Sequence, residues 1–319
     1  MSEIVVVAEE NAKPFLKQDL TASFIAGGVS GAFSRTVVSP FERAKILFQV
    51  QGPGAGNYQG IFSTIYNMWK EEGAAGLFRG NGINCVRVFP YQAVQFVTFQ
   101  YLKTEILTHH NDSTIDQLTT VERLGAGAIA GTISVLATYP MDLVRTRLSI
   151  QTAQNLAKLK QSKINLTVVK PPGFWQLFGK VYATEGGLLG LYRGFYPTTL
   201  GVAPYVAINF AVYEKMKDLW PDNTNPLMNL ANGALAGGTA QTITYPFDLL
   251  RRRFQVLTMG NNELGFQYTS VWNALVTIGK KEGFKGYYKG LTANLFKVIP
   301  SMAVGWLTFE TVKDAIVNY

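Results

Sequence analysis

Apolar residues fall into six long stretches of about 25 to 30 residues each, separated by shorter polar segments. Within the stretches no strict alternation of apolar and polar residues persists, and small residues recur four positions apart, which is a helical period. A short amphipathic segment lies between the two stretches of each pair. These segments are residues 61–70, 174–183 and 271–280. The pattern predicts an all-α protein of six long helices and three short ones, and each long helix can cross a bilayer when tilted.

Three prolines mark an internal repeat within the first, third and fifth stretches. Each is followed by an acid two positions on and a base five positions on. The three copies are PFERAK from Pro40, PMDLVR from Pro140 and PFDLLR from Pro246. A repeat with a period of about 100 residues has to be identified before any fold is assigned. Because proline removes a backbone hydrogen bond and its ring clashes with the preceding turn, we expect a kink at each proline.

Two glycines four residues apart precede each of these prolines. The pairs are Gly27 and Gly31, Gly127 and Gly131, and Gly233 and Gly237. Small residues at this spacing share one face of a helix. The sequence therefore predicts that each odd helix offers a close-packing face to a neighbour.

A second repeated element follows each short amphipathic segment. It ends in an aromatic residue, a base and a glycine, at Gly80, Gly194 and Gly290. An aromatic residue stands 19 positions after each of these glycines. It begins a second charged pattern, in which the next residue is an acid and a base follows three positions after the acid. The members of this pattern are Gln100 and Lys103, Glu214 and Lys217, and Glu310 and Lys313. The first copy departs from the others because it has an amide in place of the acid.

Composition favours a membrane protein and excludes several kinds of active site. Hydrophobic residues make up 47% of the chain and charged residues 16%, against about 25% charged in ordinary soluble domains. The single cysteine, Cys85, excludes an intrachain disulfide. The two histidines, His109 and His110, are neighbours, so we expect no catalytic triad, no metal, no cofactor and no enzymatic activity. The net charge of +8 is scattered rather than gathered in a basic patch, which argues against nucleic acid as a partner.

The repeats divide the chain into a polar N-terminal tail, residues 1–20, and three units, residues 21–110, 111–222 and 223–319. Lys and Arg are in excess in the loops that follow the odd stretches, and acids are in excess on the opposite side, so the first set is expected where positive loops remain. Residues 154–172 are expected to form a solvated loop. The N-terminal segment has no arginine and several acids, so we expect no cleaved presequence.

Acids and bases inside the predicted spans are expected to pair, because an isolated charge at membrane depth is costly. In a three-fold bundle the acid of one repeat reaches the base of the next. This predicts a ring of three pairs: Glu42 with Arg145, Asp142 with Arg251, and Asp248 with Lys45. The second charged pattern predicts another ring at the opposite mouth, weaker because Gln100 replaces an acid. Since buried pairs add little net stability, two such rings around a midplane cavity suit alternating access.

The three copies of P-x-[DE]-x-x-[KR], each followed by an [FY]-[RK]-G element, resemble the mitochondrial carrier family over residues 20–317. The resemblance implies six transmembrane helices with pseudo-three-fold symmetry, short matrix helices, and termini toward the intermembrane space. It also implies a monomer in the inner mitochondrial membrane, in contact with lipid such as cardiolipin. In the family the two rings form a matrix gate and a cytoplasmic gate. Gln49 and Gln255 stand where the family has glutamine braces, whereas Ser149 breaks that pattern.

Residues that break the three-fold symmetry between the rings point to the substrate, because a gate should obey the symmetry and an asymmetric substrate should not. Arg87, Gly201 and Lys297 occupy equivalent positions in the three repeats and match the family's substrate contact points. Arg35 stands where the other repeats have no charge. Three cations without symmetry-related acids favour a polyanion, such as a phosphate or sulfate compound.

Gly201 is followed by Val202, and Tyr205 lies one turn further on, where it could stack on a base. In the family, glycine and an aliphatic residue at this contact point go with adenine-nucleotide-type substrates. Stretches such as GLFRGNGINC and QTITYPFDLLRRRFQVL resemble the branch that exchanges adenosine 5′-phosphosulfate and 3′-phosphoadenosine 5′-phosphosulfate against phosphate, sulfate or nucleotides. A coenzyme A or ATP-Mg/phosphate type carrier is the alternative within the family. A soluble helical-repeat scaffold is the alternative outside it.

Overall fold

The computed structural model describes residues 2–52, 60–109, 118–162, 172–219, 226–257 and 268–317, with side chains from residue 25 onward except at 151–162, 226–227, 230 and 317. In this part of the chain all regular structure is helical, which confirms the all-α prediction. The odd stretches form α1 (Ser2–Val50), α4 (Thr120–Ser162) and α8 (Pro226–Val256). The even stretches form α3 (Asn81–His109), α7 (Phe195–Leu219), and α10 (Leu291–Phe296) followed by α11 (Val298–Val317).

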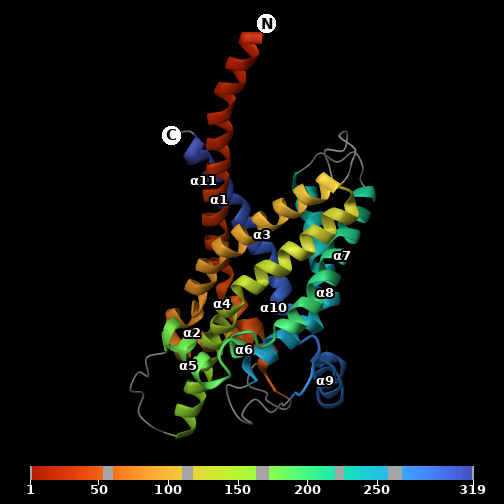
Figure 1. The fold of residues 1–319 in the computed structure, drawn as a ribbon. Coiled ribbons are helices and arrows are strands. Elements are labelled where there is room, and N and C mark those ends of the chain that lie inside the picture. Colours follow the sequence, from red (N-terminus) through yellow and green to blue (C-terminus); the bar gives the residue numbers. More distant parts are fainter. Residues whose placement is uncertain are drawn as a thin grey trace.

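The short helices begin where the amphipathic pattern predicts them. They are α2 (Ile61–Leu77), α5 (Phe174–Thr184) with the single turn α6 (Leu188–Leu191), and α9 (Val271–Gly286). Figure 1 shows them gathered at one end of the molecule, opposite the C-terminal end of α11. We call the end that carries the short helices the ring end, and the opposite one the far mouth.

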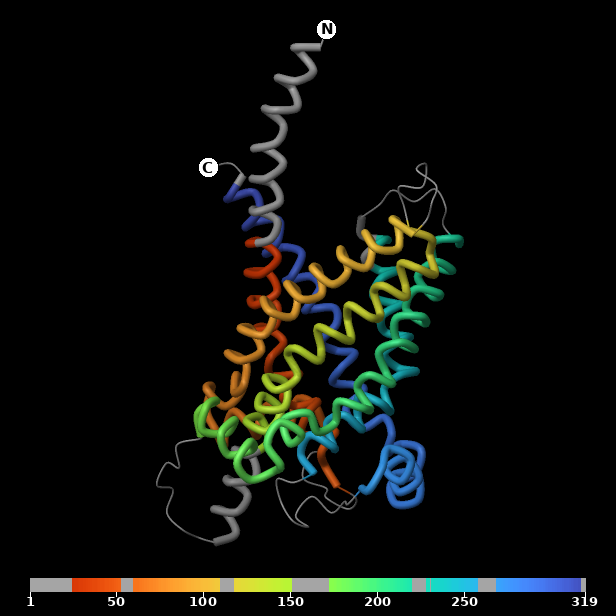
Figure 2. Tube along the Cα trace, viewed as in Figure 1, coloured from red at the N-terminus to blue at the C-terminus, as the bar shows by residue number. Residues whose placement is uncertain are grey.

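The six long helices form a closed bundle because each even helix packs along the odd helix of the next repeat. The closest packing is between α3 and α4, between α7 and α8, and between α11 and α1. The last contact joins the final long helix to the first, and Figure 2 shows the two running side by side. Side-chain hydrogen bonds hold this seam: Ser30 Oγ donates to the Gly305 carbonyl at 2.6 Å and Ser34 Oγ to the Ser301 carbonyl at 2.7 Å.

The motif prolines lie inside continuous helices. Pro140 belongs to α4 and Pro246 to α8, and Pro40 lies within the range of α1. Each helix continues through its proline, so the charged residues that follow stay on the same helix as the residues before it. The hydroxyl groups of Thr138 and Thr244, two residues before the second and third prolines, bond back to carbonyls one turn earlier.

The prediction that the spaced glycines form close-packing faces is wrong at the first glycine of every pair. A Cβ atom added to Gly27, Gly127 or Gly233 would meet no atom within 4 Å. Gly131 and Gly237 have only ordinary contacts, at 3.9 and 3.8 Å, and Gly31 alone is tight, at 3.3 Å from Val88. The physical reason is that these faces of α4 and α8 border cavities rather than a neighbouring helix, so the missing side chains leave space.

The repeated [FY]-[RK]-G glycines are needed for close approach. Gly80, Gly194 and Gly290 have φ values of 82°, 84° and 87°, a left-handed conformation that favours glycine. A Cβ atom there would lie 3.3, 2.9 and 3.0 Å from the carbonyl oxygens of Arg145, Arg251 and Lys45. These carbonyls belong to the motif bases of the next repeat, so each glycine allows one repeat to pack on its neighbour.

Two observations refine the predicted helix ends and spans. The helix α4 continues to Ser162, so the prediction of a solvated loop is wrong for residues 154–162, which contain good helix formers and no glycine or proline. Residues 163–171 of the predicted loop lie outside the described residues. By length and apolar composition, one stretch of the described chain qualifies as a membrane span, Thr120–Ile150, with mean hydropathy 1.3.

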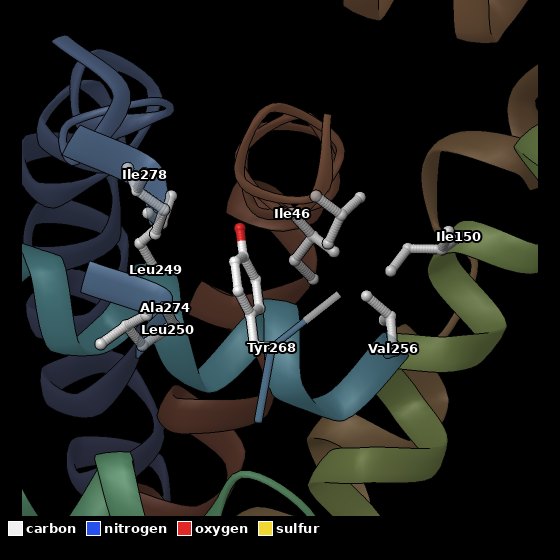
Figure 3. Packing of buried hydrophobic residues seen from close by; sticks show 9 residues of the cluster. Ile46, Ile150, Leu249, Leu250, Val256, Tyr268, Ala274 and Ile278 are labelled. Atoms are coloured by element: carbon white, nitrogen blue, oxygen red, sulfur yellow. The ribbon is translucent and has the colours of Figure 1, made fainter. Parts of the chain in front are cut away.

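An apolar cluster fills the ring end below the motif charges. It joins the three odd helices, through Ile46 of α1, Ile150 of α4 and Leu250 of α8, to Ile278 of α9. Figure 3 shows these side chains converging with Tyr268 between them. The cluster seals the ring end, because its members are almost fully buried.

Candidate functional site

The motif acids and bases form a ring of three ion pairs, each joining two repeats. Lys45 Nζ lies 2.5 Å from Asp248 Oδ2, and Arg251 Nη2 lies 2.8 Å from Asp142 Oδ2. Arg145 pairs with Glu42. The structure thus brings together the six residues that the sequence assigns to the matrix gate, in the pairing expected. All six side chains are at most 20% exposed.

Glutamine side chains support two of the three pairs. Gln49 Nε2 donates to Asp248 Oδ2 at 3.2 Å and to the Tyr245 hydroxyl at 3.1 Å. Gln255 Nε2 donates to Asp142 Oδ2 at 2.8 Å and to the Tyr139 hydroxyl at 3.3 Å. Both tyrosines in turn donate to the carbonyl before a motif glycine. The two predicted glutamine braces therefore contact the acids of the ring.

Asp142 is surrounded by more cations than the other two acids. Besides Arg251, it accepts a hydrogen bond from Arg252 Nη1 at 3.0 Å and has Arg87 Nη2 at 3.9 Å. Arg252 also bonds Thr146 and the side-chain oxygen of Gln255, at 2.5 and 2.9 Å. Because charged partners and hydrogen bonds offset the cost of burying a carboxylate, Asp142 is the best-supported acid of the ring.

A second cyclic set of contacts lies nearer the short helices. The Nε atoms of three buried arginines donate to backbone carbonyls of the next odd helix: Arg43 to Ser149 at 3.2 Å, Arg147 to Gln255 at 2.9 Å, and Arg253 to Gln49 at 3.0 Å. We call these three residues the arginine collar. Each also pairs with the glutamate that precedes the glycine of its own short-helix segment: Glu72, Glu185 and Glu282.

Glu282 illustrates the electrostatics of the arginine collar. Burial acts to raise the pKa of its carboxyl, but hydrogen bonds and positive charge from Arg253 and Lys289 outweigh burial and hold the pKa below its usual value. Its oxygens lie 2.8 Å from Arg253 Nη2 and 2.6 Å from Lys289 Nζ. The carboxylate is therefore charged at neutral pH and fixes α9 to α8.

A cationic cavity of about 400 Å³ lies on the far-mouth side of the ion-pair ring. The predicted substrate cations Arg35, Arg87 and Lys297 all line it, and so does Arg252. Lys297 stands between α10 and α11, where the third even helix is interrupted. Counted together with the ring, this region holds seven cations and three acids. The cations are Arg35, Lys45, Arg87, Arg145, Arg251, Arg252 and Lys297, and the acids are Glu42, Asp142 and Asp248.

A second cavity of about 330 Å³ is lined mainly by apolar and aromatic residues. Gly201 and Val202 belong to it, together with Tyr91 and Phe247. Tyr205, Gln241 and Asp248 line both cavities, so the two share a wall. A Cβ atom on Gly201 would lie 3.0 Å from Phe247 Cβ, which shows that this glycine also lets α7 approach α8.

The substrate cations contact acids or amides of the ring region rather than standing alone. Lys297 Nζ donates to Glu42 Oε1 at 3.1 Å, Arg35 Nη1 donates to Asn84 Oδ1 at 3.3 Å, and Arg87 faces Asp142. The guanidinium group of Arg87 also lies over the Tyr91 ring, 5.7 Å from its centroid. The sequence argument considered acids at symmetry-related positions and missed these, because they come from the gate motif of another helix.

The residues of the second charged pattern stay apart at the far mouth. Gln100, Lys217 and Glu310 are exposed, and Lys103, Glu214 and Lys313 are half-buried. All six lie in the described part of the chain, and no ion pair there joins any two of them. Their assignment to a second gate stays a prediction.

Sequence reasoning missed several residues of the site. Tyr91 and Arg252 line the cavities, Asn84 bonds Glu42 and Arg35 of the lining, and the arginine collar joins the odd helices nearer the short helices. Asn84 could have been found from the repeat, because it stands four residues after a motif glycine and Asn294 occupies the equivalent place. The collar is harder to find, since Arg43 follows its proline by three residues and Arg147 and Arg253 follow theirs by seven.

Comparison with known proteins gives a consistent result. The family model described as mitochondrial carrier protein matches residues 17–110, 116–224 and 222–319. The chain is 58% identical to the uncharacterized mitochondrial carrier YPR011C of Saccharomyces cerevisiae, over the full length of both. It is 39% identical to the mitochondrial adenine nucleotide transporter ADNT1 of Arabidopsis thaliana, over 99% of this chain and 94% of the relative. It is 37% identical to solute carrier family 25 member 16 of Homo sapiens, over 92% and 87%.

Proposed function

This chain belongs to the mitochondrial carrier family, and on that basis we propose that it exchanges adenine-nucleotide-type anions across the inner mitochondrial membrane. Members of this family are multi-pass transporters and not enzymes. The substrates that we propose are adenosine 5′-phosphosulfate and 3′-phosphoadenosine 5′-phosphosulfate. Their counter-substrates would be phosphate, sulfate or other nucleotides.

The observation that carries the proposal is the pair of joined cavities, one cationic and one aromatic. Both have the volume of small-molecule sites. The excess of cations suits a compound with several negative charges, because arginine binds phosphate and sulfate oxygens in a bidentate manner. The neighbouring cavity offers Tyr91, Tyr205 and Val202 for a planar base. An adenine nucleotide can place its base in one cavity and its charged groups in the other.

The arrangement of the two charged patterns supports exchange by alternating access. The ion-pair ring and the apolar cluster close one end, while the far-mouth residues stay unpaired within the described chain. Substrate that enters from the far mouth reaches Arg35, Arg87 and Lys297 before it reaches the ring. Opening the ring and pairing the far mouth would then release it on the other side.

Orientation, lipid and assembly are part of the same proposal. The excess of Lys and Arg near the short helices supports placing the ring end toward the matrix, with both termini toward the intermembrane space. We propose that the protein works as a monomer in contact with inner-membrane lipid such as cardiolipin.

Two carriers of other compounds remain to be separated from this proposal. The Arabidopsis thaliana relative is an adenine nucleotide transporter by name, which supports an adenine nucleotide as substrate. A coenzyme A or ATP-Mg/phosphate type carrier would use the same two cavities, because each of those substrates also joins an adenine to phosphates.

Uptake by reconstituted liposomes tests the proposal. Liposomes preloaded with each candidate are supplied with labelled adenosine 5′-phosphosulfate, 3′-phosphoadenosine 5′-phosphosulfate, ADP, ATP, coenzyme A or phosphate. We expect the sulfonucleotides to exchange fastest. Faster uptake of coenzyme A or of ATP with Mg²⁺ would show that the proposed substrate is wrong and that the alternative carrier type is right. Lack of uptake of every adenine compound would refute the substrate class.

A further inference from the structure

Glu42 differs from the other two acids of the ion-pair ring in what supports it. At the other two pairs a glutamine stands four residues after the motif base and a tyrosine stands just before the proline of the motif acid. For the Glu42–Arg145 pair these positions are occupied by Ser149 and Ser39. The Ser149 hydroxyl donates to the Arg145 carbonyl at 3.0 Å rather than to the carboxylate. The Glu42–Arg145 pair therefore lacks both the glutamine and the tyrosine found at the other two pairs.

Besides Arg145, Glu42 has two donors: Lys297, which lines the cationic cavity, and Asn84, which is bonded to Arg35 of that lining. Lys297 Nζ donates to Oε1 at 3.1 Å, and Asn84 Nδ2 donates to Oε2 at 3.3 Å. The other end of the Asn84 amide accepts from Arg35 Nη1 at 3.3 Å. Asn84 is fully buried, so its amide is held between the two charged groups. Two predicted substrate cations thus reach the same gate acid, one directly and one through Asn84.

An anion bound in the cavity would compete with Glu42 for these cations. Taking up Lys297 and Arg35 removes one charged donor from the carboxylate and releases the amide of Asn84 from its second partner. Glu42 would then keep Arg145 and the amide of Asn84, now held at one end only, whereas Asp142 keeps Arg251, Arg252 and Gln255. A buried carboxylate that loses part of its support is destabilised in the closed ring. Binding energy would therefore be converted into opening at this pair.

We propose that Glu42 is an acid shared between the substrate site and the ring, and that the ring opens first at the Glu42–Arg145 pair when an anion takes Lys297 and Arg35. Asn84 is the positioning residue that connects Arg35 to this acid. The inference rests on the proposed function, because it assumes that the cavity binds an anion that is exchanged.

The contact can be tested without any transported substrate. Thermal unfolding in detergent is measured for Glu42→Gln, Asn84→Ala and the double variant, and the same cycle is made with Asn81→Ala as the control. Asn81 lies one turn earlier on α3 and also bonds α1, through Thr36 at 2.9 Å. We expect the Asn84 cycle to depart from additivity by about 2 °C in Tm and the Asn81 cycle to be additive. Additive behaviour of the Asn84 cycle would overturn the shared acid.

The role in opening is tested by comparing exchange with one-way efflux in liposomes loaded with adenosine 5′-phosphosulfate. If Asn84 helps to keep the ring closed until substrate binds, Asn84→Ala should raise the ratio of efflux to exchange at least threefold. Asn81→Ala should leave this ratio unchanged even where it lowers the amount of folded protein. Asn84→Thr, which copies Thr198 of the second repeat, serves if the alanine variant does not fold.

A second substitution supplies a rescue. Ser149→Gln places an amide at the missing brace position, between the two repeats where Ser39 stands in place of the tyrosine found in the other two repeats. We expect it to lower the efflux ratio and, combined with Asn84→Ala, to return the ratio toward the parent value. An unchanged ratio in both Asn84 variants would refute the role in opening. Failure of the parent protein to exchange any adenine compound would refute the proposed function instead, and the unfolding cycle would still decide whether Glu42 is the shared acid.

Discussion

The ring end and the far mouth carry the same kinds of side chain in opposite arrangements. In both patterns an acid and a base stand three residues apart on one helix, repeated three times, except that Gln100 replaces one acid. At the ring end every acid pairs with a base of another repeat, whereas the six far-mouth residues form no ion pair with one another in the described chain. In this structure the charged motif alone therefore does not determine whether its acids and bases pair.

The supporting contacts also differ between the two ends. The ring has glutamines, tyrosines and the arginine collar around it, and an apolar cluster below it. The far-mouth residues are exposed or half-buried, where ion pairs contribute little. Because net stabilisation by buried pairs is also small, the balance between the two ends can be shifted by a bound ligand.

The largest effect is expected from Asp142→Asn, which leaves Arg251, Arg252 and Arg87 facing a neutral amide. Breaking a buried pair typically costs about 3–5 kcal/mol, so we expect a large fall in Tm in detergent. Asp218→Asn, at an exposed position near the end of α7, is the control and should shift Tm little. An equal shift in the two variants would mean that the ring does not stabilise this state.

Next in size is the loss of substrate cations. Arg87→Ala and Lys297→Ala should each lower the exchange rate about a hundredfold while the protein still folds, because removing one partner of a buried charge interaction costs about 2–5 kcal/mol. Arg123→Ala, exposed on α4, is the control in the same liposome measurement. Unchanged exchange in either variant would show that the cavity assignment is wrong.

A smaller effect is expected from Gln49→Ala. Removing this amide takes a hydrogen bond from Asp248 and from Tyr245, which costs about 1–3 kcal/mol when the groups left behind are buried. Tm in detergent should fall by several degrees less than in Asp142→Asn. The exposed Gln92→Ala on α3 is the comparison, and a matching shift there would remove the case for a brace.

The smallest effect is expected at the far mouth. Gln100→Glu supplies the missing acid, so the second ring should be more stable and exchange slower, by roughly twofold for an exposed pair. The liposome exchange rate is the measurement, with Gln100→Ala as the control for loss of the amide alone. Faster exchange in the glutamate variant would contradict a gate at this position.

Most of the fold and the ring of ion pairs could be predicted from the sequence, because the residues that form them repeat three times. The helices and the cross-repeat pairing of Glu42 with Arg145 follow from spacing, and the cavity position of Lys297 is expected from the resemblance to the family. The spacing of residues could not predict which neighbour each helix face would meet. The paired glycines of α4 and α8 border cavities, and Asn84 reaches Glu42 only because α3 and α1 pack in a particular register.

The arginine collar has a consequence for how the chain is made. Arg253, in the last repeat to be synthesised, donates to the carbonyl of Gln49 in the first. The end of α1 thus acquires one of its partners only after the third repeat has been translated and inserted. Deleting any one repeat would leave a buried arginine without its acceptor on one side and a helix end without its donor on the other. Biogenesis should therefore proceed as a single closing event, and partial chains should remain substrates for chaperones and proteases until it occurs.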